Sequence, residues 1–137
     1  MTISDIGSVA TAIAVLIAAW ELRFNNRIAR AHYEDSLDRQ YRDLAMVIPM
    51  DLFLGKEVEI TVEQREAIFN YFDLSNEQIY QNIKGRITKD TWKDWRAGIL
   101  ANMNKPGFRA VYKEVQDSSK DTFTYLNQLL EQNYEQR

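Results

Sequence analysis

An uncharged apolar run near the N-terminus constrains this chain more than any other feature. Between Ile6 and Trp20, fifteen consecutive residues carry no charge, and most of them are Ala, Ile, Val or Leu. The twenty residues from Ile3 to Leu22, wound as an α-helix at about 1.5 Å per residue, would cross a hydrocarbon core of about 30 Å. We therefore expect a single transmembrane helix within residues 1–24.

Two alternatives compete with a membrane anchor because the run is only moderately hydrophobic. Its strongly apolar residues contribute roughly −2 to −4 kcal/mol toward insertion. Gly7, Ser8 and Thr11 dilute the hydrophobicity, which is compatible with a buried core helix of a soluble protein. A cleaved signal peptide needs a basic segment before its apolar stretch, and here that segment contains Asp5 and no Lys or Arg. We favour the anchor over both alternatives.

Aromatic and basic residues follow the apolar run immediately. Aromatic side chains favour the membrane interface, and Lys and Arg concentrate on its cytoplasmic side. Because no basic residue precedes the run, this rule places the N-terminus outside and the rest of the chain in the cytoplasm, most naturally at a bacterial inner membrane. The predicted interface residues are Trp20, Arg23, Phe24, Arg27 and Arg30.

Small residues recur within the predicted anchor at spacings of three or four. Gly7, Ala10, Ala14 and Ala18 would form one stripe along a helix. Such a stripe lets helix backbones approach closely in lipid, where packing drives association. Ala is also a common filler in bacterial anchors. The stripe leads to the hypothesis of a homo-oligomer formed within the membrane.

The remainder of the chain is expected to be entirely α-helical. No Gly or Pro occurs from Asn26 to Ile48, so the anchor should continue as a juxtamembrane helix over residues 25–48 and end near Pro49. Residues 49–137 then form a four- or five-helix cytoplasmic domain packed as a bundle. Several helix boundaries are expected within this domain. One helix should begin with a capping box at Thr61 and end near Lys84 to Arg86, and the next should begin with a cap at Thr88 or Asp90 and stop at a break from Asn104 to Gly107. A last helix should follow Asp117 to Ser119 and carry Phe123, Leu126, Leu130 and Tyr134 on one face.

Composition excludes several classes of function. The chain has no Cys, which removes disulfides, thiol catalysis and thiolate metal sites, and its single His argues against a zinc site. Seventeen basic and twenty acidic residues alternate along the chain, which argues against a dedicated nucleic-acid surface. We expect no metal and no cofactor.

One spacing suggests a catalytic pair. Arg27 and His32 form an Arg-x4-His pattern that resembles a family of helical RNA-cleaving domains, in which the residue after Arg is usually polar. Here Ile28 takes that place, and the pair follows directly on the anchor. A juxtamembrane Arg and a surface His explain the pattern better than a nuclease does.

A second resemblance covers most of the chain. Trp92-Lys-Asp-Trp95, the segment from Asn104 to Arg109, Tyr112 and Phe123 resemble a family of uncharacterised bacterial proteins with an N-terminal anchor and a cytoplasmic helical domain. The resemblance implies that architecture and brings no assigned reaction.

These observations favour a non-enzymatic membrane protein. The leading hypothesis is a chain that self-associates through its anchor and binds a cytoplasmic protein partner. One alternative is an oligomeric, membrane-disrupting effector in phage defence, as in some accessory proteins of RNA-guided immunity, because pore walls need not be strongly hydrophobic. A second alternative is the nuclease that would use Arg27 and His32.

Overall fold

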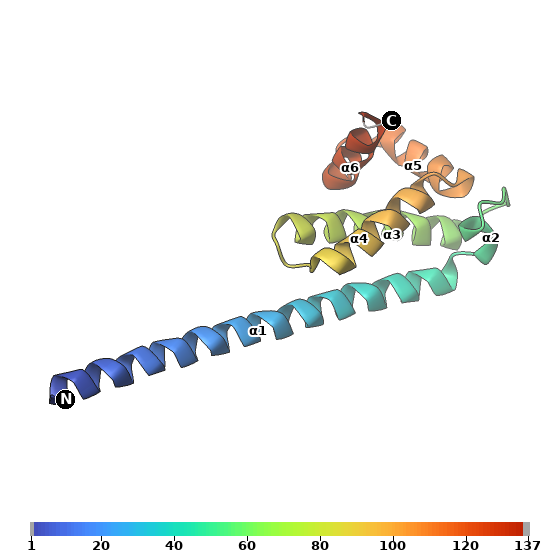
Figure 1. Ribbon diagram of the computed structural model, residues 1–137. Helices are drawn as coiled ribbons and strands as arrows, with labels where there is room; N and C mark the ends of the chain where they lie inside the picture. Colours follow the sequence, from blue (N-terminus) through green and yellow to red (C-terminus); the bar gives the residue numbers. More distant parts are fainter. Residues whose placement is uncertain (1, 136–137) are drawn as a thin grey trace.

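The structure is a computed structural model that describes residues 2–135, and every regular element in that range is a helix. Figure 1 shows one very long helix, with the remaining helices gathered toward the end of it that is farther from the N-terminus. The helices are α1 (Ile3–Val47), α2 (Met50–Phe53), α3 (Val62–Ile83), α4 (Lys89–Met103), α5 (Pro106–Ser118) and α6 (Thr124–Glu135).

Helix α1 runs without interruption for 45 residues. Thr2 caps its start, because its side chain accepts a hydrogen bond from the backbone N–H of Asp5 while the Asp5 carboxylate accepts one from the N–H of Thr2. The helix ends where Pro49 forces the preceding residue, Ile48, into extended backbone. The expected rod that joins the anchor to the juxtamembrane segment and ends near Pro49 is confirmed.

Local sequence signals set both ends of α3. Thr61 and Gln64 form the predicted capping box. After Ile83 the chain turns at Gly85, whose φ of 71° is a conformation that favours glycine. Not every apolar residue of α3 faces the core, since the side chain of Val62 is 71% exposed and that of Ile83 is 58% exposed.

Aromatic side chains fill the centre of the core. Tyr71 of α3 packs against its neighbour Phe72 and against Phe108 of α5, and Phe72 packs against Phe123, which directly precedes α6; the ring centroids are 5.3 to 6.2 Å apart. Edge-on packing of this kind adds to the free energy gained by burying the rings. Ile48 and Leu52 close one end of this core.

The junction between α4 and α5 depends on two residues. Pro106 occupies the first turn of α5, where the missing N–H costs no hydrogen bond. Gly107 lies against α2, and a Cβ at this position would collide with the side chain of Leu52. The break predicted at Asn104 to Gly107 is confirmed, and the close approach of α2 explains why a glycine stands there.

Helix α6 differs from its predicted face at one position. Phe123 and Leu126 are buried and Leu130 is partly buried, but Tyr134 is 62% exposed. The helix leaves the core at its C-terminal end, so Tyr134 lies at the rim of a cavity instead of the core.

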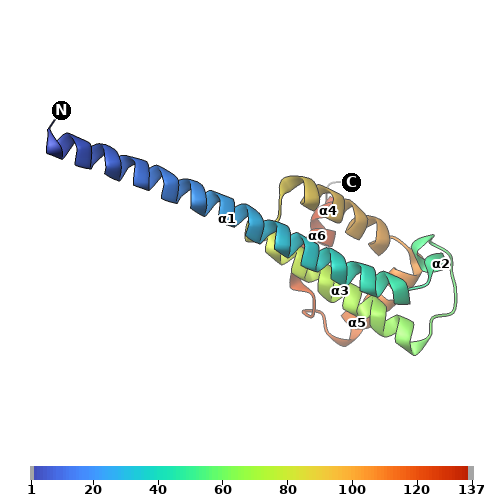
Figure 2. The same cartoon turned by 90° about the horizontal axis from the view of Figure 1, so that it is seen from below.

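The C-terminal part of α1 is packed against α3, and the views in Figures 1 and 2 agree on this arrangement. Leu37 of α1 forms a small apolar cluster with Leu74 of α3 and Ile87 of the turn before α4. We call residues 33–135 the helical domain. The N-terminal part of α1 projects beyond it.

Candidate functional site

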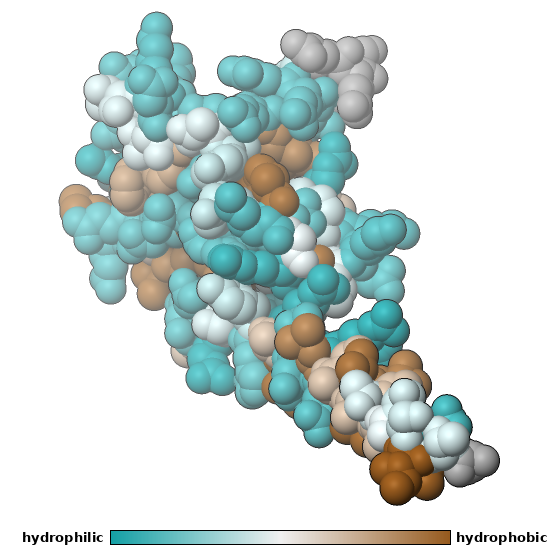
Figure 3. Space-filling model, turned by 90° about the vertical axis from the view of Figure 1, so that its left-hand side faces the viewer, coloured by the Kyte–Doolittle hydropathy of each residue, from teal (hydrophilic) through white to brown (hydrophobic). Residues whose placement is uncertain are grey.

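The projecting part of α1 is covered by no other part of residues 2–135. Its apolar 18-residue window has no buried residue, and the helix is long and apolar enough to cross a membrane. Figure 3 shows the contrast between the hydrophobic end of the rod and the largely hydrophilic helical domain. The alternative that this segment is a core helix of the chain's own fold is therefore wrong. Seven strongly apolar side chains are at least half exposed: Ile3, Ile6, Val9, Ile13, Val15, Leu16 and Ile17.

The small-residue stripe lies on the side of α1 that faces away from the helical domain. At 100° per residue, the mean direction of the stripe is about 170° from that of Glu34, Leu37 and Asp38, which contact α3, α4 or the turn between them. A Cβ added at Gly7 would meet no atom within 4 Å, so that position of the stripe is open. The stripe consists of Gly7, Ala10, Ala14 and Ala18.

The predicted interface residues gather on the next turns of α1. The rings of Trp20 and Phe24 stack, with centroids 5.7 Å apart and planes inclined by 14°. Around them is a shallow concavity of about 440 Å³. The side chains that line it are Trp20, Arg23, Phe24, Asn26, Arg27 and Arg30.

Arg27 and His32 are both exposed on α1. Five residues of helix turn the chain by 500°, which separates the two side chains by about 140° around the axis. One chain therefore does not bring them together over a common substrate atom. Within residues 2–135, no hydrogen bond or ion pair positions the His32 ring.

Two carboxylates that the sequence analysis did not single out attach α1 to α4. Glu34 accepts hydrogen bonds from the backbone N–H of Thr88 at 2.6 Å and from the hydroxyl of Thr91 at 2.9 Å. One turn further along, Asp38 accepts one from the indole N–H of Trp95 at 3.0 Å. The sequence offered one hint of this role, because Glu34 and Asp38 lie four residues apart on either side of the apolar Leu37. Acidic residues at that spacing are equally typical of a solvent-exposed helix face.

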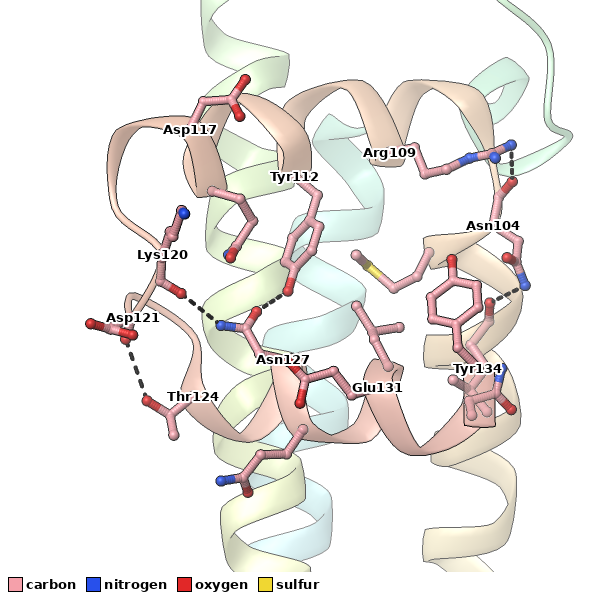
Figure 4. Close-up of a pocket in the computed structure, with 16 residues that line it drawn as sticks. Asn104, Arg109, Tyr112, Asp117, Lys120, Asp121, Thr124, Asn127, Glu131 and Tyr134 are labelled. Atoms are coloured by element: carbon pink, nitrogen blue, oxygen red, sulfur yellow. Dashed lines mark hydrogen bonds between the residues drawn. The ribbon is translucent and has the colours of Figure 1, made fainter. Parts of the chain in front are cut away.

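A second candidate site is a cavity of about 600 Å³ between α4, α5 and α6. Figure 4 shows Tyr112 and Asn127 pointing toward one another across it, with Arg109 and Asn104 at one end and Lys120 and Asp121 at the other. The Tyr112 hydroxyl donates to the Asn127 side-chain oxygen. The side-chain nitrogen of Asn127 in turn donates to the carbonyl of Lys120 at 2.9 Å.

The polar groups of this cavity are largely used for structure. The Arg109 guanidinium donates to the carbonyl of Asn104 at 2.9 Å, which ties α5 to the end of α4. Burial, together with the nearby Glu131 carboxylate, raises the pKa of Tyr112 to about 12, so its hydroxyl stays protonated at neutral pH. The side-chain nitrogen of Gln116 is buried and makes no hydrogen bond within the described residues. The cavity can donate hydrogen bonds, but none of the described side chains that line it is an activated base or nucleophile.

Metal ligation finds no support in the described part of the chain, because residues 2–135 contain no group of three or more His, Asp or Glu side chains that could hold an ion. Comparisons of the chain with protein families, with curated proteins and with solved structures find no match. The resemblance carried by Trp92, Trp95 and the turn at Pro106 stays a prediction.

Proposed function

We propose that this chain is a non-enzymatic, single-span protein of the bacterial inner membrane that self-associates through its anchor and carries a helical domain in the cytoplasm for a protein partner. One observation carries the proposal. The apolar N-terminal half of α1 is a regular helix with no covering inside the chain. Apolar surface of that extent is stable only in lipid or against other protein.

The continuous helix supports a rigid link between anchor and domain. Between the end of the predicted span at Leu22 and the first docked residues near Tyr33, α1 has no Gly or Pro and no break in its hydrogen bonding. Eleven residues of helix place the domain about 16 Å beyond the hydrocarbon edge. The domain would therefore stand just outside the headgroup layer.

The position of the stripe supports self-association. Because the stripe and the docking face lie on opposite sides of α1, two rods could pack along Gly7 and Ala14 while their helical domains point outward. No contact inside either domain would have to break. An interface on the docking side would instead bring the two domains into collision.

The anchor is tested first by extracting membranes of expressing cells with alkaline carbonate. We expect the chain to remain in the membrane pellet. Because the chain has no Cys, Ser4→Cys and Ser119→Cys each introduce a single thiol whose side of the membrane can be read with an impermeant maleimide. Labelling of Ser4→Cys alone in intact cells supports the orientation. Release by carbonate contradicts the anchor, and labelling of Ser119→Cys alone contradicts the orientation.

Self-association is tested by oxidative crosslinking of single-cysteine variants in native membranes. Ala14→Cys lies in the stripe, and Leu16→Cys lies on the opposite side of the helix at nearly the same depth, as a matched control. We expect disulfide-linked dimers from Ala14→Cys and few from Leu16→Cys. Equal crosslinking of both would show random collision, and monomers from both would contradict a membrane interface.

A further inference from the structure

Two surface concavities join at the place where α1 leaves the membrane region and meets the helical domain. The first is the one that contains the Trp20 and Phe24 stack. The second has a volume of about 330 Å³ and lies between α1 and the turn from α3 to α4. Asn26 and Arg30 line both, so the two form one continuous surface. We call this surface the membrane-proximal corner; its second half is lined by Asn26, Ala29, Arg30, Tyr33, Gly85 and Arg86.

The charge of this corner has one sign. The side chains that line its two halves include four arginines and no Asp or Glu. None of the ion pairs formed within residues 2–135 involves them. Glu34, the first acidic residue beyond the corner on α1, already accepts two hydrogen bonds from α4. The four arginines are Arg23, Arg27, Arg30 and Arg86.

Arg86 is held in place although it comes from a different element. Its guanidinium lies 5.8 Å from the centre of the Tyr33 ring and donates to the Gln81 side-chain oxygen at 3.0 Å. These contacts hold the positive charge of Arg86, which belongs to the turn between α3 and α4, next to α1. An arginine that is fixed in this way loses less side-chain freedom when it binds a phosphate or carboxylate.

The corner begins within the headgroup layer and extends a few ångströms beyond it. Along the helix axis, Arg23, Arg27 and Arg30 lie about 2, 8 and 12 Å beyond Leu22, whereas each headgroup layer is about 5–8 Å thick. Long arginine side chains reach back toward the interface. Phospholipid phosphates would therefore be within reach of all three, with the two aromatic rings at the hydrocarbon edge.

We infer that the membrane-proximal corner is a binding site for the phosphate groups of anionic phospholipids in the same membrane, with Arg30 and Arg86 closing it from two elements. This inference rests on the proposed anchoring of α1. Such a site would retain anionic lipid next to the chain and hold the helical domain in one orientation relative to the bilayer.

The test uses the full chain reconstituted into vesicles of equimolar phosphatidylglycerol and phosphatidylcholine with identical acyl chains. The chain is extracted in mild detergent, and the lipids retained by it are counted by native mass spectrometry. We expect the wild type to retain phosphatidylglycerol preferentially. Arg30→Gln combined with Arg86→Gln should lower that preference by about fivefold or more, because each arginine near an anionic surface contributes about that factor.

Matched variants separate a site from general charge. Arg39→Gln combined with Arg42→Gln removes the same charge from exposed positions of α1 outside the corner and should leave the preference unchanged. Arg30→Lys combined with Arg86→Lys keeps the charge and should retain most of it. Arg30→Gln alone, at an exposed side chain, should lower the preference without disturbing the fold.

Each outcome bears on a different statement. Equal preference in the wild type and the Arg30 and Arg86 variants would overturn the site, as would an equal loss in the Arg39 and Arg42 control. Competition by inorganic phosphate beyond that of chloride at equal ionic strength would assign the corner to a soluble anion and overturn the lipid site. Failure of the wild type to float with the vesicles would overturn the anchor itself, which carbonate extraction reports separately.

Discussion

Replacing Glu34 by Ala should loosen the attachment of α4 to the rod. The Glu34 carboxylate accepts one hydrogen bond from the backbone N–H of Thr88, which is the N-cap residue of α4, and another from the hydroxyl of Thr91. At the start of α3, the side chain of Gln64 accepts the corresponding hydrogen bond from the N–H of the N-cap residue Thr61. Glu34 therefore caps α4 in the same way, but from a different helix. Its negative charge also lies at the positive end of the α4 dipole.

The size of the effect follows from the exposure of these groups. Hydrogen bonds to charged groups contribute about 1.5–3 kcal/mol where solvent is excluded, and Glu34 is half-buried while Thr88 is exposed. We therefore expect Glu34→Ala to lower the free energy of unfolding by about 1–2 kcal/mol, a discounted value for groups that water reaches. Glu34→Gln keeps a neutral acceptor and should cost about half as much.

Urea unfolding of the detergent-solubilised full chain measures this change. All variants carry Trp20→Phe, so that emission comes from Trp92 and Trp95 on α4. With a slope of about 1.5 kcal/mol per M, the midpoint should fall by about 1 M. Because the Trp95 indole is bonded to Asp38, the same signal reports the separation of α1 from α4.

An adjacent carboxylate provides the control. Asp35 is exposed, and its replacement by Ala should change the free energy of unfolding by no more than about 0.5 kcal/mol. A Glu34→Ala variant as stable as Asp35→Ala would refute the assignment of Glu34 as a cap supplied by another helix. So would a double variant of Glu34→Ala and Thr91→Ala whose two effects simply add, because a shared hydrogen bond must couple them.

Four further predictions concern the helical domain. Tyr71→Phe should cost about 1–3 kcal/mol in urea unfolding, because the buried side-chain nitrogen of Asn102 loses its acceptor at 3.0 Å. Burial raises the pKa of Tyr71 to about 12 from 10.0, so the folded state keeps a proton that the unfolded state loses. The stabilisation that the protonated Tyr71 provides below pH 10 should therefore be lost between about pH 10 and 12. Circular dichroism should show a smaller loss of stability over this range in Tyr71→Phe than in the wild type. An equal loss in both would show that Tyr71 is not its cause. Gly107→Ala should lower the free energy of unfolding by about 1–3 kcal/mol because its Cβ collides with Leu52, and an unchanged urea midpoint would show that α2 is free to move. Thr61→Ala should cost about 1 kcal/mol by removing the cap of α3, and hydrogen exchange that is no faster in its first turn would contradict this.

Helix boundaries that depend on residues within one helical turn could be predicted from the sequence. Thr61 with Gln64 predicted the start of α3, Gly85 followed its end, and Pro49 limited α1. Each depends on backbone geometry or on a side chain three residues away. The length of the apolar run likewise predicted a helix that the rest of the chain leaves uncovered.

The start of α4 was predicted less well. Thr88 occupies the N-cap position, as one of the two expected residues, but its side chain accepts no backbone N–H. Its hydroxyl is hydrogen-bonded to that of Thr91, and Glu34 takes the backbone N–H. Helix α6 has a similar dependence, since the side-chain oxygen of Asn76 on α3 accepts from the N–H groups of Tyr125 and Leu126 at 2.9 and 3.1 Å.

The same division applies to the candidate sites. The aromatic and basic residues from Trp20 to Arg30 are close in sequence, so their grouping on α1 was predictable. Arg86 joins them from a turn more than fifty residues away, and the polar residues around Tyr112 and Asn127 meet only when α5 and α6 pack. The separation of Arg27 and His32 around the helix was also derivable from the sequence, because residues 25–48 were expected to be helical and five residues of helix turn the chain by about 500°.

The helical character of the chain, the ends of most of its helices and the need of its first helix for lipid or protein around it all followed from the amino-acid sequence. These properties arise from backbone conformation, capping and hydrophobicity, which act over a few residues. The packed structure was needed to identify the side of α1 that docks on α3 and α4, the side that leaves the small-residue stripe free, and the distant carboxylate and arginine that meet that helix. Those choices depend on how apolar faces pack and on which polar groups must find partners once water is excluded.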